Sequence, residues 1–323
     1  MCTAISFKTK DHYFGRNLDL EFSYGEEITI TPRNFPFYFR NINDISKHFA
    51  IIGMATISDN YPLYYDATNE YGLSIAGLNF PDNAVYFEKM NEKDNIAPFE
   101  LIPWILSQCR SVTEAKAYLS RINITNQSFC DDFPLTPLHW LIADKESSVV
   151  IESTNSGLHI YDDPYGLLTN NPPFPYHLEN IKNYINLTAL EPENRFAPQK
   201  EIVPYSRGMG GIGLPGDLSS ASRYIRAAFT KLNSVCDTDE TDSVCQFFHI
   251  LDAVAQVKGC NHINENWEIT RYSSCCNTNK GIYYYKTYNN IQLTAVCLNN
   301  MNLDSSNLMR FPLRNKGNIF YEN

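Results

Sequence analysis

The chain has 323 residues, of which 43% are hydrophobic, 13% aromatic and 19% charged, a composition typical of a folded globular protein rather than a disordered one. Its formal net charge is −10 and no block of lysine or arginine interrupts the sequence, which argues against nucleic-acid binding. No segment approaches the roughly 18 apolar residues of a membrane helix, and the start lacks the pattern of a secretory signal. The sequence therefore predicts a cytoplasmic protein without a membrane partner, whose nine cysteines are mostly buried free thiols.

The first half of the chain predicts strands followed by helices. Four segments are rich in β-branched and aromatic residues and are bounded by turn residues: Thr3–Lys8, His12–Arg16, Glu27–Thr31 and His48–Ile57. Two helices are predicted next, Phe99–Cys109 from its apolar spacing and a second one to about Arg121, which Ser111 and Glu114 open as a capping box. The turn Asn155-Ser-Gly157 predicts a hairpin between Ser147–Thr154 and Gly157–Tyr161.

The second half contains a long irregular segment before helices and strands resume. Residues 183–218 are rich in Pro and Gly and poorly periodic, which is typical of a functional or interface loop. Helices are predicted at Ser219–Val235 and Asp242–Val257, the second ending at Gly259, and strands at Trp267–Ser273, Gly281–Tyr288 and Gln292–Leu298. This order predicts an α+β arrangement of layered sheets covered by helices, and the lack of a repeat or linker predicts a single domain over residues 1–323.

The start of the chain carries the first candidate for chemistry. Processing removes an initiator Met when the second residue is small, and this would leave Cys2 with a free α-amine. Such an amine has a reference pKa of about 7.7–8.0, so it can act as a general base near neutral pH without a histidine. A cysteine is also an intrinsically strong nucleophile when it is a thiolate. The alternative is that a cysteine at position 2 is accidental.

Two charged residues are predicted to lie beside Cys2. The strands Thr3–Lys8 and His12–Arg16 form a plausible antiparallel hairpin, which brings Arg16 and Asp19 back to the start of the chain. A guanidinium there would favour the thiolate, and a carboxylate would hold the α-amine by hydrogen bonding. A surface ion pair is the alternative interpretation of these two residues.

Five segments, spaced in order along the chain, carry a resemblance to a known family. They are Met-Cys-Thr at the start, Gly15-Arg-Asn-Leu-Asp19, Gly77-Leu-Asn-Phe-Pro81, Leu168-Thr-Asn-Asn-Pro172 and Ser222-Arg-Tyr-Ile-Arg226. Together they resemble the choloylglycine hydrolase family, which joins bile salt hydrolases and penicillin V acylases within the N-terminal-nucleophile hydrolases. The resemblance implies a four-layer αββα sandwich. It also implies that 183–218 is an assembly loop that reaches across subunits in a homotetramer.

The resemblance implies roles for the residues nearest the chain start. Cys2 matches the nucleophile, and Arg16 and Asp19 match residues that orient and activate it. Asn79 matches the position whose backbone N–H helps to form the oxyanion hole and whose side chain approaches the amino-acid part of the substrate. Penicillin V acylases tend to carry Tyr at that position, so Asn79 favours the bile salt hydrolase branch; apart from the resemblance, Asn79 before Phe80-Pro81 would be a strand end.

Two further matches each have a neighbouring alternative. Asn170 matches the side-chain donor of the oxyanion hole, but Asn171 is adjacent, and the pair before Pro172 would also pass for a turn. Arg223 matches the family arginine near the nucleophile, and Arg226 is the weaker candidate. Apart from the resemblance, such an arginine would be a solvated residue on an amphipathic helix.

The predicted reaction is hydrolysis of glycine- or taurine-conjugated bile salts, as the resemblance implies. The steroid body would lie in an apolar pocket, for which the predicted walls are Phe14 and Leu18, with Tyr61–Tyr65 and Phe129–Leu135 as further candidates, Phe129 among them. The alternatives are a penicillin V acylase and a non-catalytic bile-acid or lipid carrier. The preference between glycine and taurine is left open.

The sequence predicts neither a cofactor nor a metal. Gly208-Met-Gly-Gly-Ile-Gly213 matches a dinucleotide-binding pattern literally, but Tyr-Ser-Arg precedes it and Leu-Pro-Gly follows it, where a strand and a helix would be needed. The seven histidines are scattered without the spacing of metal ligands.

Overall fold

The computed structural model describes residues 1–323 and is built on two main antiparallel sheets. The first sheet has six strands in the order β12-β1-β2-β15-β16-β17. Their bounds are β1 Cys2–Lys8, β2 His12–Leu20, β12 Leu167–Leu168, β15 Ile269–Asn277, β16 Ile282–Thr287 and β17 Asn290–Cys297. The predicted strands at both ends of the chain are thus confirmed, and they meet in one sheet because β2 pairs with β15.

The second sheet has eight strands in the order β11-β10-β9-β6-β5-β4-β3-β18. Their bounds are β3 Glu27–Thr31, β4 Ile51–Ser58, β5 Tyr61–Asn69, β6 Ser74–Asn79, β9 Leu138–Ala143, β10 Ser148–Thr154, β11 Gly157–Asp162 and β18 Met309–Pro312. Two small ribbons lie outside the main sheets, one of β7 Asp94–Ile96 and β8 Ile122–Ile124, the other of β13 His262–Ile263 and β14 Asn266–Trp267. The predicted hairpin at Asn155-Ser-Gly157 is confirmed as β10 and β11.

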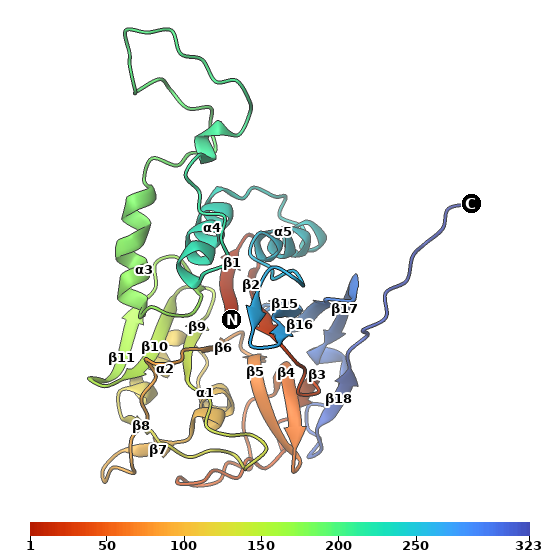
Figure 1. The fold of residues 1–323 in the computed structure, drawn as a ribbon. Coiled ribbons are helices and arrows are strands. Elements are labelled where there is room, and N and C mark those ends of the chain that lie inside the picture. The colour runs from red at the N-terminus through yellow and green to blue at the C-terminus, as the bar shows by residue number, and fades with distance from the viewer.

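Helices cover the outer faces of the two sheets, which gives the four-layer αββα order expected from the resemblance (Figure 1). On the first sheet lie α4 Ser220–Asn233 and α5 Glu240–Asp252, and on the second lie α1 Leu101–Gln108 and α2 Val112–Leu119. A fifth helix, α3 Phe174–Asn180, follows β12. Apolar side chains of α4 and α5 belong to the same core as those between the two sheets, and α1 and α2 pack on a second core.

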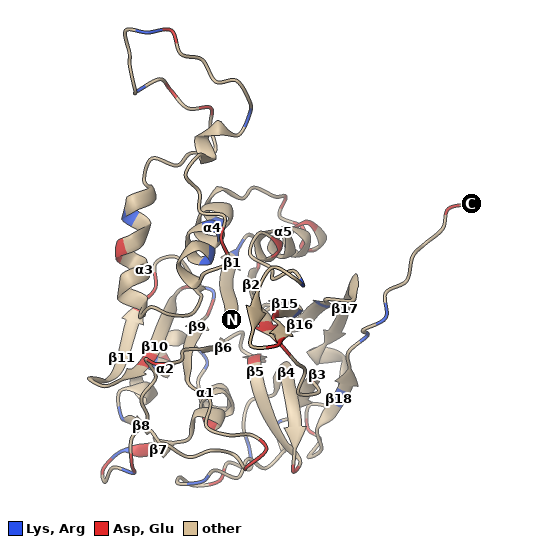
Figure 2. Ribbon diagram, viewed as in Figure 1, with Lys and Arg blue, Asp and Glu red and all other residues tan.

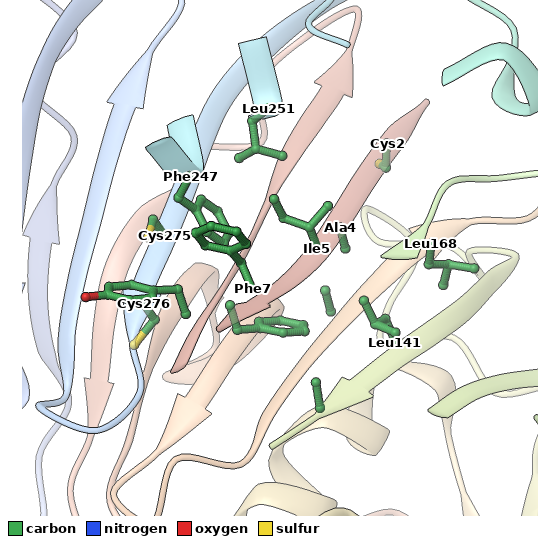
Figure 3. Close-up of a cluster of buried hydrophobic side chains, with 14 of the residues drawn as sticks. Cys2, Ala4, Ile5, Phe7, Leu141, Leu168, Phe247, Leu251, Cys275 and Cys276 are labelled. Carbon is green, nitrogen blue, oxygen red and sulfur yellow. The ribbon is translucent and has the colours of Figure 1, made fainter. Parts of the chain in front are cut away.

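Strand β1 lies inside this core and divides its side chains between two faces (Figure 3). Phe7 meets Phe247 of α5 edge to face, with ring centroids 6.4 Å apart, so this face of the strand packs against helices. Because side chains alternate along a strand, Cys2 and Ala4 point the other way, toward the second sheet. Burial of a large apolar side chain such as Ile5 stabilises the fold by about 1.5–3 kcal/mol.

Two details of the predicted helices are corrected. Ser111 caps α2 by accepting from Glu114 N at 3.2 Å, but the Glu114 carboxylate accepts from Arg110 N, so the capping box is not reciprocal. Helix α5 ends at Asp252 rather than Val257. It ends early because the backbone of Gln256 bonds to Thr270 at the start of β15, which an α-helix through this region would prevent.

Residues 183–218 leave the body of the protein as a long arm (Figure 1). The arm begins within one short 3₁₀ turn, η2 Ile181–Tyr184, and holds a second, η3 Met209–Gly211. It exposes large apolar side chains, among them Leu190, Phe196 and Tyr205, which are 75%, 95% and 87% exposed. Isolated surface hydrophobics are ordinary, but a set of this size on one projecting segment is typical of an interaction surface.

Charged residues are dispersed over the whole fold. Figure 2 shows lysine and arginine scattered singly along helices, loops and the C-terminal segment, without forming a basic face. None of the helices has the length and apolar character needed to cross a membrane. All nine cysteines are free thiols.

Candidate active site

The register of the first sheet brings the candidate residues to Cys2. In the β1–β2 hairpin Cys2 pairs with Leu18 and Ala4 pairs with Arg16, so the guanidinium lies on the Cys2 face of the sheet. The ladder continues one residue further, because Met1 and Asp19 exchange two backbone hydrogen bonds of 2.9 and 3.0 Å. On the other side, β12 pairs Ala4 with Leu168, and the same register places Asn170 opposite Cys2.

Gly15 explains why β2 can lie so close to β15. A Cβ at this position would stand 2.0 Å from the carbonyl oxygen of Ser274, which is far inside contact distance. Any larger residue would push β15 away from β2. Since β15 carries Thr270, which bonds to Asp19, Gly15 helps to place the Asp19 carboxylate.

Arg16 is fully buried and spans the gap between the sheets. Its Nη1 donates to the carbonyl oxygens of Gly77 on β6 and Tyr65 on β5, at 2.5 and 3.1 Å. Its Nη2 has no protein partner. Burial opposes the charged form, but the facing negative charges, with Cys2 foremost, raise the pKa of Arg16 above its ordinary value. Arg16 therefore places a fixed positive charge on the face of the sheet that carries Cys2.

Asp19 is also fully buried, and one of its carboxylate oxygens is unpaired. Oδ1 accepts from the Thr270 hydroxyl at 2.6 Å, while Oδ2 has no partner. Burial raises the pKa of Asp19, and the terminal ammonium and Arg223 oppose that rise. A buried carboxylate oxygen of this kind is costly unless a cation faces it, and the chain terminus supplies one.

Met1 precedes Cys2 in the sequence, and its peptide bond makes the nitrogen of Cys2 an amide. Its ammonium contacts Glu268, and burial lowers the pKa of this ammonium. With Met1 attached, the nitrogen of Cys2 is an amide and donates to Asn170 Oδ1 at 2.8 Å. Removal of Met1 turns the same nitrogen into an amine, held at a position already bonded to Asn170 and one residue from Asp19.

Asn170 and Arg223 complete the cluster. Asn170 Oδ1 also accepts from Arg223 Nη2 at 2.6 Å, and Asn170 Nδ2 donates to the carbonyl oxygen of Asn79 at 2.6 Å. Arg223 Nη1 donates to Cys2 O and to the Thr3 hydroxyl, at 2.5 and 2.6 Å. Because an arginine can only donate, the oxygen of the Asn170 amide must face Arg223, and its Nδ2 therefore faces Asn79.

The neighbouring alternatives bind elsewhere. Asn171 Nδ2 donates to the carbonyl oxygen of Pro81. Arg226 donates to the carbonyl oxygens of Pro215, Asp217 and Ala253. The structure thus brings together residues from five segments of the chain: Cys2, Arg16, Asp19, Asn170 and Arg223 through their side chains, and Asn79 through its backbone.

Residues 2–311 match the linear amide C–N hydrolases of the choloylglycine hydrolase family. The chain belongs to this family. A bile salt hydrolase/transferase from Lactiplantibacillus plantarum is 52% identical over 324 residues and the full length of both chains. One from Clostridium perfringens is 38% identical over 96% of each.

Solved structures agree with the fold of this choloylglycine hydrolase. A mutant of the conjugated bile acid hydrolase from Clostridium perfringens superposes with a TM-score of 0.93, at 37% identity and full coverage of both chains. Penicillin V acylase from Agrobacterium tumefaciens gives a TM-score of 0.76 at 15% identity, covering 97% of this chain and 91% of that one, and shares the fold. The N-terminal-nucleophile hydrolase fold predicted from the sequence is confirmed.

The predicted pocket walls lie at different depths in this hydrolase. Leu18 is the pairing partner of Cys2 and is buried. Phe14 pairs with Ser6, four residues along β1 from Cys2, and is buried at 1% exposure in the core between the sheets. Phe129 packs against Tyr61 in a separate aromatic cluster, with ring centroids 5.7 Å apart. A contact of these three side chains with substrate stays a prediction.

Sequence reasoning missed two aromatic residues just beyond β2, Phe22 and Tyr24, which extend the predicted wall Phe129–Leu135. Phe22 contacts Tyr24, Tyr24 contacts Phe133 and Phe133 contacts Phe129, with successive ring centroids 4.9, 5.9 and 6.3 Å apart. Phe22 and Tyr24 are about half exposed, at 52% and 40%. The signal in the sequence was their position, four and six residues after the partner of Cys2.

Two cavities lie away from Cys2, which is itself 2% exposed. One, of about 380 Å³, lies between the β2–β3 turn, β15 and the C-terminal segment. The other, of about 430 Å³, lies between β8 and the β10–β11 hairpin. No group of three or more His, Cys, Asp or Glu side chains converges as a metal site.

Proposed function

We propose that this enzyme hydrolyses the amide bond of glycine- or taurine-conjugated bile salts, with Cys2 as nucleophile. The observation that carries the proposal is the convergence of Arg16, Asp19, Asn170 and Arg223 on the one cysteine whose nitrogen can become a free amine. The names of the relatives, conjugated bile acid hydrolase and bile salt hydrolase/transferase, supply the substrate class.

The first half of the proposed reaction acylates Cys2. The α-amine takes the thiol proton, and the thiolate, which the charge of Arg16 stabilises, attacks the amide carbonyl. Asn170 Nδ2 and the backbone N–H of Asn79 donate to the oxyanion of the tetrahedral intermediate. A donor of this kind is typically worth about 2.7–4 kcal/mol in the transition state. The α-ammonium returns its proton to the departing amino acid as the C–N bond breaks.

The second half releases the bile acid. The same α-amine takes a proton from water, which attacks the thioester, and the free carboxylate leaves as the thiol is restored. Asp19 holds the amine in both halves, and Arg223 keeps the Asn170 amide turned with Nδ2 toward the reacting carbonyl. The apolar body of the substrate is expected against Leu18 and the rings of Phe22, Tyr24 and Phe129, with Phe14 deeper in the core.

The choice among the candidate functions is tested by three parallel measurements on the purified enzyme. We expect release of free glycine and taurine from glycocholate and taurocholate, and much slower release of phenoxyacetate from penicillin V, because Asn79 stands where penicillin V acylases tend to carry Tyr. Fast turnover of penicillin V alone would favour the acylase. Stoichiometric binding of cholate without any amino acid release would favour a carrier.

We also propose that the projecting arm, residues 183–218, joins subunits into a homotetramer. Its exposed apolar side chains, Leu190, Phe196 and Tyr205 among them, support this role. Sedimentation of the wild-type protein is expected to give four times the mass of the 37.0 kDa chain. A variant with Phe196→Ser and Tyr205→Ser should sediment as a smaller species, and an unchanged mass would contradict the proposal. A cytoplasmic location stays a prediction.

A further inference from the structure

A buried histidine, His139 on β9, touches both segments that carry the proposed oxyanion donors. Its ring stacks on Phe80, which follows Asn79, with centroids 4.3 Å apart and planes at 4°. Its Nε2 lies 3.0 Å from the carbonyl oxygen of Thr169, which precedes Asn170. The strands support this position, because β9 pairs His139 with Leu78 on β6.

Glu152 on β10 sets the orientation of this ring. Nδ1 of His139 lies 3.1 Å from Glu152 Oε1, and neither side chain has any exposed surface. A carbonyl oxygen can only accept, so Nε2 must carry the hydrogen that bonds to Thr169. Nε2 faces Thr169 and Nδ1 faces Glu152, so the two contacts together hold the ring in place beside the backbone of the oxyanion segment.

Glu152 also ties down the far end of that segment. Its Oε1 accepts from the backbone N–H of Phe174, the first residue of α3, at 2.9 Å. The side chain of Glu152 thus holds the chain four residues beyond Asn170, and His139 holds it one residue before.

The backbone of Asn170 itself has two further restraints. Its N–H donates to the Ser220 hydroxyl at 2.8 Å, and its carbonyl oxygen accepts from His177 Nε2 at 3.0 Å. Burial lowers the pKa of His177 to about 4, so this ring is a neutral donor near neutral pH. Ser220 and His177 act on the Asn170 segment alone, whereas His139 also packs on the residue after Asn79.

We propose that His139, oriented by Glu152, is a positioning residue that sets the separation of the two oxyanion donors, Asn79 and Asn170. This inference rests on the proposed function. The donors engage fully only when the carbonyl oxygen becomes an oxyanion, so a change in their separation affects the transition state more than the bound substrate. The loss of His139 therefore lowers kcat and leaves KM nearly unchanged.

Two substitutions at His139 separate the hydrogen bond from the mere filling of space. His139→Leu removes the donor to Thr169, and His139→Gln keeps an N–H group near the place of Nε2. We expect kcat for glycocholate to fall about 100-fold in His139→Leu, the size of effect that a 1 Å misplacement can produce. His139→Gln should keep a larger share of the activity, and Glu152→Gln should resemble it.

The matched control is His12→Gln. His12 is also buried, at 2% exposure, and contacts the hydroxyls of Ser6 and Thr278 at the far end of the β1–β2 hairpin. Loss of its ring removes a buried imidazole without touching the oxyanion segments, so kcat should stay within about threefold of the wild type. Thermal melting of every variant shows whether it is folded.

A second readout distinguishes positioning from general damage. Alkylation of Cys2 by iodoacetamide displaces iodide and forms no oxyanion, so its rate should be the same in the His139 variants and the wild type. Alkylation that falls in parallel with kcat, or a His139→Leu variant as active as His12→Gln, would overturn the inference. A wild-type enzyme that releases no amino acid from glycocholate or taurocholate would instead overturn the proposed function.

Discussion

Replacing Cys2 by alanine is expected to lower kcat for glycocholate hydrolysis by roughly 10⁴-fold or more, the order found when an enzyme loses its nucleophile. Without sulfur no acyl intermediate can form, and the remaining donors, Asn79 and Asn170, can only polarise the carbonyl. Cys2→Ser should be nearly as inactive, because a serine hydroxyl ionises far less readily beside the same amine. Release of free glycine, followed with ninhydrin, measures both variants.

Cys245→Ala is the control for this prediction. Cys245 is an exposed free thiol on α5, outside the cluster around Cys2, and its loss should leave kcat within about twofold of the wild type. Mass spectrometry of the enzyme trapped with a slowly hydrolysed amide should show the acyl adduct on Cys2 alone. Substantial hydrolysis by Cys2→Ala would rule out this residue as the nucleophile.

A chain that keeps Met1 is expected to be folded but inactive. In this state the nitrogen of Cys2 is an amide bonded to Asn170 Oδ1, and Met1 occupies the backbone bonds of Asp19. An amide nitrogen cannot take the thiol proton, so the reaction loses its general base. No other base is bonded to Cys2 in the cluster, since Arg16 and Arg223 are cations and Asp19 is bonded to Thr270.

A removable N-terminal extension, cut by a protease immediately before Cys2, tests this prediction on a single preparation. Activity should be absent before cleavage and should rise in proportion to the fraction of chains that begin with Cys2, measured by intact mass. The matched control carries the same extension and a cleavage site that leaves Met1 in place; it should stay inactive after cutting. Full activity before cleavage would show that the α-amine is not the base.

The sequence predicted the ends of the fold better than its middle. The β1–β2 hairpin follows from two apolar segments around Thr9-Lys-Asp11, and its register alone carries Arg16 and Asp19 to Cys2. By contrast, β5 and β6 were not predicted, although they are central strands of the second sheet. In β5 a buried aspartate, Asp66, accepts from the hydroxyls of Tyr272 and Tyr283. A charged residue in the middle of a strand interrupts the run of apolar residues by which a buried strand is predicted.

Contacts between distant segments select among the site residues for which the sequence offered two neighbouring candidates. Asn170 and Asn171 stand in the same turn, and only the pairing of β12 with β1 turns one toward Cys2 and the other toward Pro81. Arg223 and Arg226 lie on one helix three residues apart, and the choice depends on which side of α4 faces β1. His139 gave no signal in the sequence, because its role arises from two partners that lie 59 and 30 residues away along the chain.

The position of β1 inside its sheet determines how the enzyme loses activity on heating. Chain termini usually fray, and a nucleophile at a terminus would be expected to melt first. Here β1 is hydrogen-bonded to β2 from Cys2 to Lys8 and to β12 at Ala4 and Ile5, so the strand cannot detach without breaking two ladders. Amide protons of this strand should exchange with deuterium only through global opening, and thermal inactivation should coincide with cooperative melting of the whole sheet.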